Sequence, residues 1–366
     1  MRFTIRRLRL TVSTAAAAAA TALAATIALP TPASPAPSPV GATSTAAGLP
    51  RLNITSSYVT GISSGGYMAT QLQVAYSSRF RGAGIFSAGP YYCAQQSLAL
   101  ALAACTANTT PTELPKLIAQ TDQYAQAGKI DPTSNLATQP TWFFWGTKDQ
   151  TVVGSVADDL AAYYRHYRVP LKYRNSEPAG HAWISRLGLN PCGVTSPPFI
   201  NDCGPGVDTD MLSTMFGSVK PRNTGAPRGE VISFSQDPYA APAKLGAGDP
   251  ARSGAAAIGM GPSGYAYVPS SCKGGTPCKL VVALHGCRQT AGEIGTTFVK
   301  QSGLNEFADT NRFVVLYPQA NRDETFGNPK GCWDWWGYLG PNDDDYATRG
   351  GPQMATVMSM VGAVKG

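Results

Sequence analysis

The stretch from residue 58 to residue 68 limits the folds open to this chain more than any other. It reads Tyr-Val-Thr-Gly-Ile-Ser-Ser-Gly-Gly-Tyr-Met, with an extended, β-branched run at 54–60 before it and a helix-like segment at 67–80 after it. Strand, sharp turn and helix in this order are typical of a nucleophile elbow, in which Ser63 is the nucleophile. Gly61 and Gly65 supply the room that such a strained turn needs. The competing interpretation is a Gly/Ser-rich loop that matches a five-residue pattern by chance.

The amino-terminal segment has the layout of an export signal. Four arginines precede a run of Ala, Leu, Val, Thr and Ile at 10–29, which predicts a signal peptide over 1–25. A Pro/Ala/Ser/Thr-rich lead-in follows to residue 50, and its composition favours disorder. A membrane anchor is the competing interpretation, but the apolar run is Ala-rich and no charged flank follows it. We therefore expect a secreted, extracellular protein without a membrane anchor.

Eight cysteines agree with export, because an even number can be paired by oxidation outside the cell. We expect each cysteine to pair with its neighbour in the chain. The chain has no Cys-x-x-Cys and no His-x-x-x-His spacing, so a zinc site is not expected. The expected pairs are Cys93 with Cys105, Cys192 with Cys203, Cys272 with Cys278, and Cys287 with Cys332.

The charge of the chain argues against nucleic acid as a partner. The formal net charge is +7, and the four arginines of the predicted signal account for four of those charges, which leaves +3 for the rest. After residue 50 there is no cluster of Lys and Arg interleaved with aromatic residues, as a surface that follows a phosphate backbone would need.

Three predicted strands lead to residues that could form a catalytic triad: 54–60 leads to Ser63, 140–146 to Asp149 and 170–176 to His181. A further short strand, 83–88, follows the elbow helix. In open parallel sheets, active groups collect at the carboxyl ends of strands. Of the three histidines, His166 lies within a predicted helix at 156–167 and His285 belongs to another motif, which leaves His181 as the candidate base. The order serine, aspartate, histidine is that of α/β-hydrolases.

The strand predicted at 279–284 runs directly into His285-Gly286, the pattern of an oxyanion loop. In lipases this loop precedes the elbow, but here it follows the elbow by about two hundred residues. Joining the carboxyl end of the chain to a point near residue 52 would restore the usual hydrolase order. The sequence therefore predicts a circularly permuted fold, cut where the two ends lie close together. The competing account is two domains, one ending near residue 220 and one beginning near 230.

Three motifs add specificity to the elbow. They are Gly-Ile-Ser-Ser-Gly-Gly-Tyr-Met-Ala from residue 61, Ala-Leu-His-Gly-Cys-Arg-Gln-Thr from residue 283 and Gly-Cys-Trp-Asp-Trp from residue 331. Together they resemble the secreted poly(3-hydroxybutyrate) depolymerases of the circularly permuted, single-domain type. The resemblance implies an α/β-hydrolase catalytic domain over 51–366, with a mostly parallel sheet flanked by helices. It assigns the triad to Ser63, Asp149 and His181, the oxyanion hole to the backbone N–H groups of Ser64 and Cys287, and an aromatic substrate contact to Trp335.

The expected function is that of an extracellular serine esterase that hydrolyses a short-chain polyhydroxyalkanoate polyester through an acyl-serine intermediate. No metal or organic cofactor is expected, and we expect a monomer. Solid polymer would be held by an apolar patch at the mouth of the cleft, with Tyr91, Tyr92, Trp183 and Trp336 as candidates. Two alternatives stay open: a secreted carbohydrate esterase that releases feruloyl or acetyl groups, and a catalytically inactive polymer-binding protein.

Overall fold

The computed structural model describes residues 48–243, 248–249, 251–340 and 344–366. The predicted signal peptide and nearly all of the lead-in lie outside the described residues. Within the described residues, no helix has both the length and the apolar character that crossing a membrane requires.

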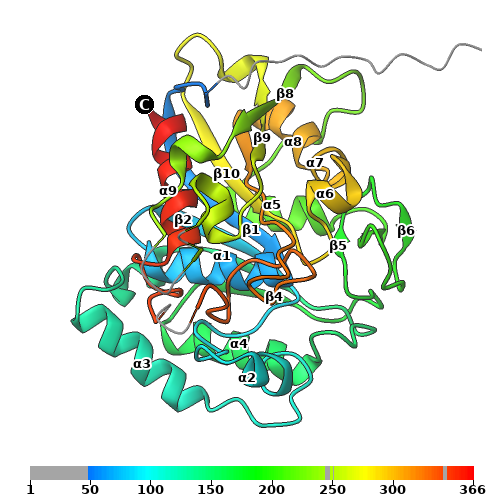
Figure 1. Cartoon of the computed structure of the whole chain (residues 1–366). Coiled ribbons are helices and arrows are strands. Elements are labelled where there is room, and N and C mark those ends of the chain that lie inside the picture. The colour runs from blue at the N-terminus through cyan, green and yellow to red at the C-terminus, as the bar shows by residue number, and fades with distance from the viewer. Residues whose placement is uncertain (1–47, 244–247, 250, 341–343) are drawn as a thin grey trace, which may run out of the picture. The chain divides into compact units, whose positions relative to one another are not determined.

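An eight-stranded, mostly parallel sheet forms the centre of the fold. Its strand order from edge to edge is β4-β3-β2-β1-β10-β11-β9-β8 (Figure 1). The first six strands in this order are parallel to one another, whereas β9 runs antiparallel to β11 and β8 antiparallel to β9. The strands are β1 Ile54–Ile62, β2 Phe80–Phe86, β3 Thr141–Phe144, β4 Leu171–Arg174, β8 Gly229–Ser235, β9 Ser263–Pro269, β10 Cys278–Leu284 and β11 Phe313–Tyr317. The expectation of a mostly parallel α/β sheet is confirmed.

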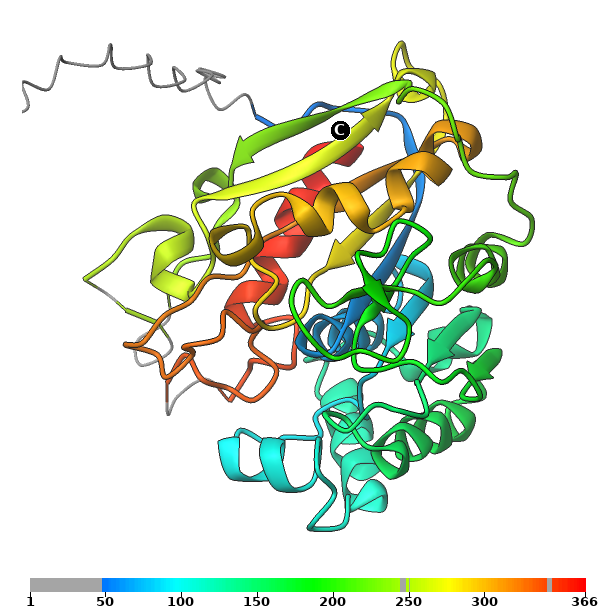
Figure 2. The same ribbon diagram turned by 90° about the vertical axis from the view of Figure 1, so that its right-hand side faces the viewer.

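Helices cover both faces of the sheet, because the central strands are apolar on both sides. In β10, Leu280, Val282 and Leu284 join the core cluster that contains α1, α4 and α9, whereas Val281 and Ala283 join the cluster that contains α5, α7 and α8. Figure 2 shows α9 (red) and the orange helices on opposite sides of the yellow strands. The helices are α1 Ser64–Ala75, α2 Leu98–Ala103, α3 Leu114–Gln126, α4 Gly154–His166, α5 Val207–Phe216, α6 Ala291–Ile294, α7 Thr297–Gln301, α8 Leu304–Asn311 and α9 Pro352–Lys365.

The region between residues 188 and 217 carries two cysteines and no clear strand pattern, which predicts a cystine-bearing loop. In the structure it holds helix α5 and most of a small sheet in the order β5-β7-β6. The three strands are β5 Trp183–Ile184, β6 Asn190–Pro191 and β7 Ile200–Asp202. Helix α5 buries Met211 and Met215 beneath the sheet, where Met211 packs against Gly84 of β2. That contact joins segments far apart in the chain, so local sequence pattern does not reveal it.

Four disulfides join the cysteines, and each links neighbours in the chain: Cys93–Cys105, Cys192–Cys203, Cys272–Cys278 and Cys287–Cys332. The first three close short loops. The fourth spans 45 residues and ties the segment after β10 to the aromatic segment that begins at Trp333. The two ends of the described chain also adjoin, because the backbone N–H of Leu52 donates to the carbonyl oxygen of Val364 at 2.8 Å (Figure 1).

Candidate active site

Ser63 stands at the turn between β1 and α1 in a conformation that few L-residues adopt. Its φ is 56° and its ψ is −122°, and its backbone N–H donates to the carbonyl oxygen of Phe86 at 3.0 Å. Such a backbone is strained and persists only where the surroundings hold it. This is the geometry that projects a serine hydroxyl from the carboxyl end of a strand, as the sequence predicts.

Two glycines are required at this turn, because a side chain at either position would clash with backbone atoms. A Cβ at Gly61 would lie 2.1 Å from the carbonyl oxygen of Gly65, and a Cβ at Gly65 would lie 2.3 Å from that of Leu284. Both distances are far shorter than any carbon–oxygen contact. The second shows that the start of α1 touches the end of β10, so the elbow and the predicted oxyanion loop share one site although they are distant in the chain.

Asp149 and His181 lie in the loops that follow β3 and β4. Nδ1 of His181 is 2.7 Å from Oδ2 of Asp149, and both side chains are almost completely buried. The other carboxylate oxygen of Asp149 accepts the backbone N–H groups of Thr151 and Val152 at 2.8 and 3.0 Å. The backbone N–H of His181 donates to the hydroxyl of Thr195 at 2.8 Å. Carboxylate and imidazole are therefore held in one mutual orientation before any ligand binds.

The loop after β10 is fixed by side chains that surround it. Nε2 of His285 accepts the backbone N–H of Ala320 at 3.1 Å, which places the proton on Nδ1, and Nδ1 then donates to the carbonyl oxygen of Gly286 at 2.7 Å. Burial lowers the pKa of His285 to about 4, so the ring is neutral at ordinary pH. The backbone N–H of Gly286 donates to Oε1 of Gln289 at 2.6 Å.

The peptide group between Gly286 and Cys287 is oriented by these contacts. In a trans peptide the C=O and N–H point in opposite directions. Because the imidazole of His285 holds the Gly286 carbonyl, the N–H of Cys287 points away from that ring. No described residue accepts a hydrogen bond from the backbone N–H of Cys287 or of Ser64. Both are unengaged donors, and both residues line the same cleft.

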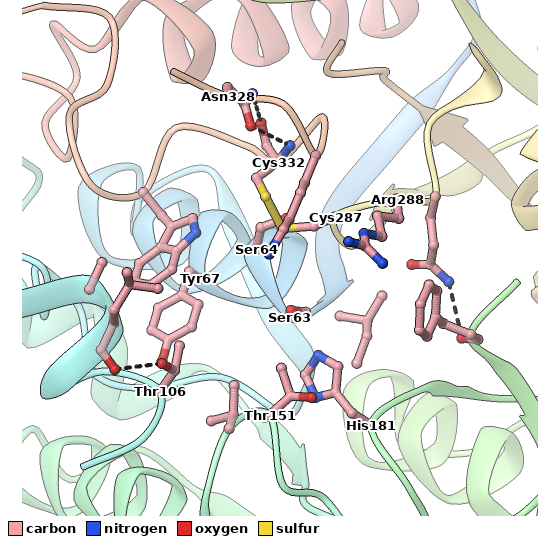
Figure 3. A pocket seen from close by; sticks show the side chains of 18 of the residues that line it. Ser63, Ser64, Tyr67, Thr106, Thr151, His181, Cys287, Arg288, Asn328 and Cys332 are labelled. Atoms are coloured by element: carbon pink, nitrogen blue, oxygen red, sulfur yellow. Dashed lines mark hydrogen bonds between the residues drawn. A yellow bond between two sulfur atoms is a disulfide. The ribbon is translucent and has the colours of Figure 1, made fainter. Parts of the chain in front are cut away.

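A cleft of about 660 Å³ brings the predicted groups together. Ser63, Ser64, His181 and Cys287 all line it, and Figure 3 shows the imidazole of His181 facing the side chain of Ser63. Asp149 stands behind His181 and is not part of the lining. The Cys287–Cys332 disulfide lies over Ser64 in the same view.

The three tryptophans of the aromatic segment, Trp333, Trp335 and Trp336, are all buried. Trp335 does line the cleft, but it is only 7% exposed, because its ring stacks on Tyr67 with centroids 4.0 Å apart. The ring of Trp335 is therefore buried, and only a small part of it faces the cleft. Its Nε1 is buried and has no hydrogen-bond partner among the described residues. Trp333 is a core residue, and its Nε1 donates to the carbonyl oxygen of His285 at 3.0 Å.

The prediction of an apolar patch at the mouth of the cleft named the wrong residues. Tyr91 and Trp183 are each 1% exposed, and Trp336 lines the cleft but is buried. Tyr92 is half-buried and packs against Tyr346. These rings pack in the core because tertiary contacts cover them. The exposed apolar side chains at the cleft are instead Leu98 and Leu102 of α2, at 51% and 58% exposure.

Two residues that support the candidate site are not among those predicted from the sequence. Thr195 and Gln289 hold the backbone of His181 and Gly286, and a single sequence offers no signal for the first. Gln289 lies within the motif that begins at residue 283, so its nearness to the oxyanion loop is visible in the sequence. Within the described residues, no group of three or more His, Cys, Asp or Glu side chains is arranged to hold a metal ion.

A family profile described as "Esterase PHB depolymerase" matches residues 264–366. Two solved structures resemble the chain over 87% of its length and 99% of theirs, each with a TM-score of 0.76. One is a serine-to-alanine variant of a PHB depolymerase complexed with an R3HB trimer, at 33% identity. The other is the PHB depolymerase from Penicillium funiculosum, at 34% identity.

Relatives of known function agree. The chain is 38% identical to a poly(3-hydroxybutyrate) depolymerase of Delftia acidovorans over 89% of its own length, and it spans 63% of that protein. It is 36% identical to a polyhydroxybutyrate depolymerase of Talaromyces funiculosus over 88% of its own length, and it spans 94% of that protein. With a shared fold and this level of identity over most of its length, the chain belongs to the PHB depolymerase family of carboxylic ester hydrolases.

Proposed function

We propose that this chain is an extracellular serine esterase that hydrolyses poly(3-hydroxybutyrate) or a related short-chain polyhydroxyalkanoate through an acyl-serine intermediate. The observation that carries the proposal is the 2.7 Å contact between His181 and Asp149 beside Ser63, in a cleft with two unengaged backbone donors. Family membership supports the substrate class, because the named relatives act on this polyester.

The first chemical step is attack of the Ser63 hydroxyl on an ester carbonyl. A serine hydroxyl is a weak nucleophile, so Nε2 of His181 removes its proton as the Oγ–carbon bond forms. Asp149 holds the imidazole in the tautomer with Nδ1–H and stabilises the imidazolium. His181 then protonates the leaving hydroxyl of the polyester, and the ester C–O bond breaks. Water, activated by the same imidazole, hydrolyses the acyl-serine.

The charge that develops on the carbonyl oxygen needs donors placed in advance. The backbone N–H groups of Ser64 and Cys287 fill that role, since both line the cleft and neither is engaged elsewhere in the described residues. A missing donor of this kind costs about 10²- to 10³-fold in kcat. Trp335 is the proposed contact for the polyester chain, through its ring edge and its unpaired indole N–H.

We further propose that the domain is a circularly permuted α/β-hydrolase. If the strands are counted from β8 through β11 and then from β1 to β4, the spatial order reads 1-2-4-3-5-6-7-8 with the second strand antiparallel. That is the strand order of α/β-hydrolases. The nucleophile then follows strand 5, the acid strand 7 and the histidine strand 8. The hydrogen bond between Leu52 and Val364 supports the proposed joining point.

Secretion follows from the proposed substrate, since a solid polyester outside the cell is reached only by an exported enzyme. Four disulfides in the structure fit an oxidising compartment. The signal peptide over 1–25 stays a prediction.

The decisive experiment measures clearing of a turbid poly(3-hydroxybutyrate) suspension by the parent and by Ser63→Ala. We expect clearing by the parent and none by the variant, with an unchanged circular dichroism spectrum. Ferulate release from a feruloylated polysaccharide, measured beside it, separates the carbohydrate-esterase alternative. Equal clearing by Ser63→Ala would refute the proposed nucleophile.

A further inference from the structure

The rim of the cleft carries positive charge that no described residue neutralises. Arg288 and Lys330 both line the cleft and both are exposed, whereas no Asp or Glu is among the described lining residues. Neither cation makes an ion pair or a side-chain hydrogen bond with another described residue. Asp149 is the acid of the proposed triad, and its two oxygens are already taken by His181 and by backbone N–H groups.

The backbone of these two cations is fixed. Arg288 adopts a left-handed conformation with φ 61°, and its N–H donates to the carbonyl oxygen of Lys330 at 2.7 Å. The Cys287–Cys332 disulfide joins the two segments beside that bond. The side chain of Asn328 in turn holds Cys332, through bonds of 2.8 and 2.9 Å to its carbonyl and N–H groups. The two charges therefore stay on one rim although their side chains are free.

The rim and the opposite wall differ in polarity. Figure 3 shows Arg288 on the other side of Ser63 from Tyr67. Trp335 stacks on Tyr67, and exposed Leu98 and Leu102 of α2 also line the cleft. A cleft with an apolar wall and a cationic rim is complementary to an apolar chain that ends in a carboxylate. A guanidinium recognises a carboxylate with two parallel hydrogen bonds, and this geometry suits Arg288.

We propose that Arg288, assisted by Lys330, binds the free carboxylate at the end of a hydroxyalkanoate oligomer. The inference rests on the proposed function. In a 3-hydroxyacyl chain the free carboxylate belongs to the unit that leaves as the alcohol. When the ester C–O bond breaks and His181 protonates the leaving oxygen, the terminal unit departs as a hydroxy acid and the rest stays on Ser63. The rim thus directs cleavage to the carboxylate end of soluble oligomers.

The test compares two substrates that differ only in that charge: a 3-hydroxybutyrate trimer as the free acid and as its carboxyl-terminal methyl ester. The measured quantity is the ratio of kcat/KM for acid over ester, in which any general loss of activity cancels. We expect Arg288→Gln to lower this ratio about tenfold, mainly through KM of the acid, because charge-assisted hydrogen bonds are lost. We expect Arg288→Lys to keep part of the ratio, and Lys330→Gln to lower it less.

The matched control is Arg79→Gln, which removes an exposed cation next to the amino end of β2, away from the cleft, and should leave the ratio unchanged. In the parent the ratio should also fall as salt rises, because exposed charges are screened. A ratio in Arg288→Gln within twofold of the parent's, or a parent ratio insensitive to salt, would overturn the inference. Either result would leave the proposed esterase intact, since only retained activity in Ser63→Ala removes that.

Discussion

Nδ1 of His285 lies 2.7 Å from the carbonyl oxygen of Gly286, the next residue in the chain, and this contact turns the N–H of Cys287 away from the imidazole. The two N–H donors proposed for the oxyanion hole are thus held in position by different parts of the protein. The N–H of Ser64 is placed by the first turn of α1, whereas that of Cys287 depends on a buried side chain. This difference leads to the first prediction.

His285→Asn should keep more activity than His285→Gln, because an Asn amide nitrogen can take the place of Nδ1 and still hold the Gly286 carbonyl. A Gln amide reaches instead toward the position of Nε2. We expect kcat of His285→Gln to fall about 10²-fold, by analogy with loss of one oxyanion donor. Affinity for a trifluoromethyl ketone, which mimics the oxyanion, should fall in parallel. If that affinity were unchanged while kcat fell, His285 would not orient the donor.

The same histidine should make folding stability depend on pH. Its pKa is about 4 in the folded chain, against an ordinary value of 6.5. Between these values the unfolded chain binds a proton that the folded chain does not, so the free energy of unfolding decreases as pH falls from about 6.5 to about 4. The full contribution is about 3 kcal/mol. Urea unfolding across this range should show a shallower pH dependence in His285→Asn, and equal slopes would contradict the assignment.

Asp149→Asn should preserve the fold and lose most of the activity. Asn can still accept the backbone N–H groups of Thr151 and Val152, but its amide would face Nδ1 of His181 and favour the wrong tautomer. We expect kcat to fall about 10³- to 10⁴-fold, as in other serine triads, with little change in KM. Single-turnover release of p-nitrophenol from a short ester measures acylation directly. An unchanged acylation rate would show that Asp149 is not the acid.

Gly65→Ala should prevent folding or cost several kcal/mol, because the added methyl would lie 2.3 Å from backbone oxygen that cannot move aside. Gly362→Ala in α9 is the matched control. Gly362 is exposed and a Cβ there meets nothing within 4 Å. In a helix this change should stabilise by about 0.5–1 kcal/mol. Thermal unfolding of both variants checks the contrast, and a mild effect at Gly65 would mean that the elbow can relax.

Trp335→Phe and Trp335→Ala separate two kinds of contact. Phe keeps the stacking on Tyr67 but removes the indole N–H, which has no described partner. We expect Phe to raise KM for an oligomeric ester modestly and Ala to raise it more, with kcat less affected in both. Initial rates on a soluble 3-hydroxybutyrate trimer give both constants. Equal behaviour of the parent and both variants would exclude Trp335 as a substrate contact.

The sequence by itself determined the parts of this protein that depend on local chemistry. Glycines around Ser63 are needed for the sharp turn, and the ends of predicted strands indicate Asp149 and His181 as the candidate acid and base. An even count of cysteines predicted four disulfides between chain neighbours. Apolar runs buried on both sides predicted a parallel sheet, because such strands must be covered on both faces.

Only the tertiary structure decided the features that depend on what packs against a residue. Long-range contacts place α5 under β2 and bury Trp335 against Tyr67. They also bury Tyr91 and Trp183 in the core. The unpaired charge of Arg288 is likewise a property of its neighbours. Groups that are distant in the chain decide whether a side chain is exposed and whether its charge is paired. The pattern of adjacent residues therefore cannot predict either property.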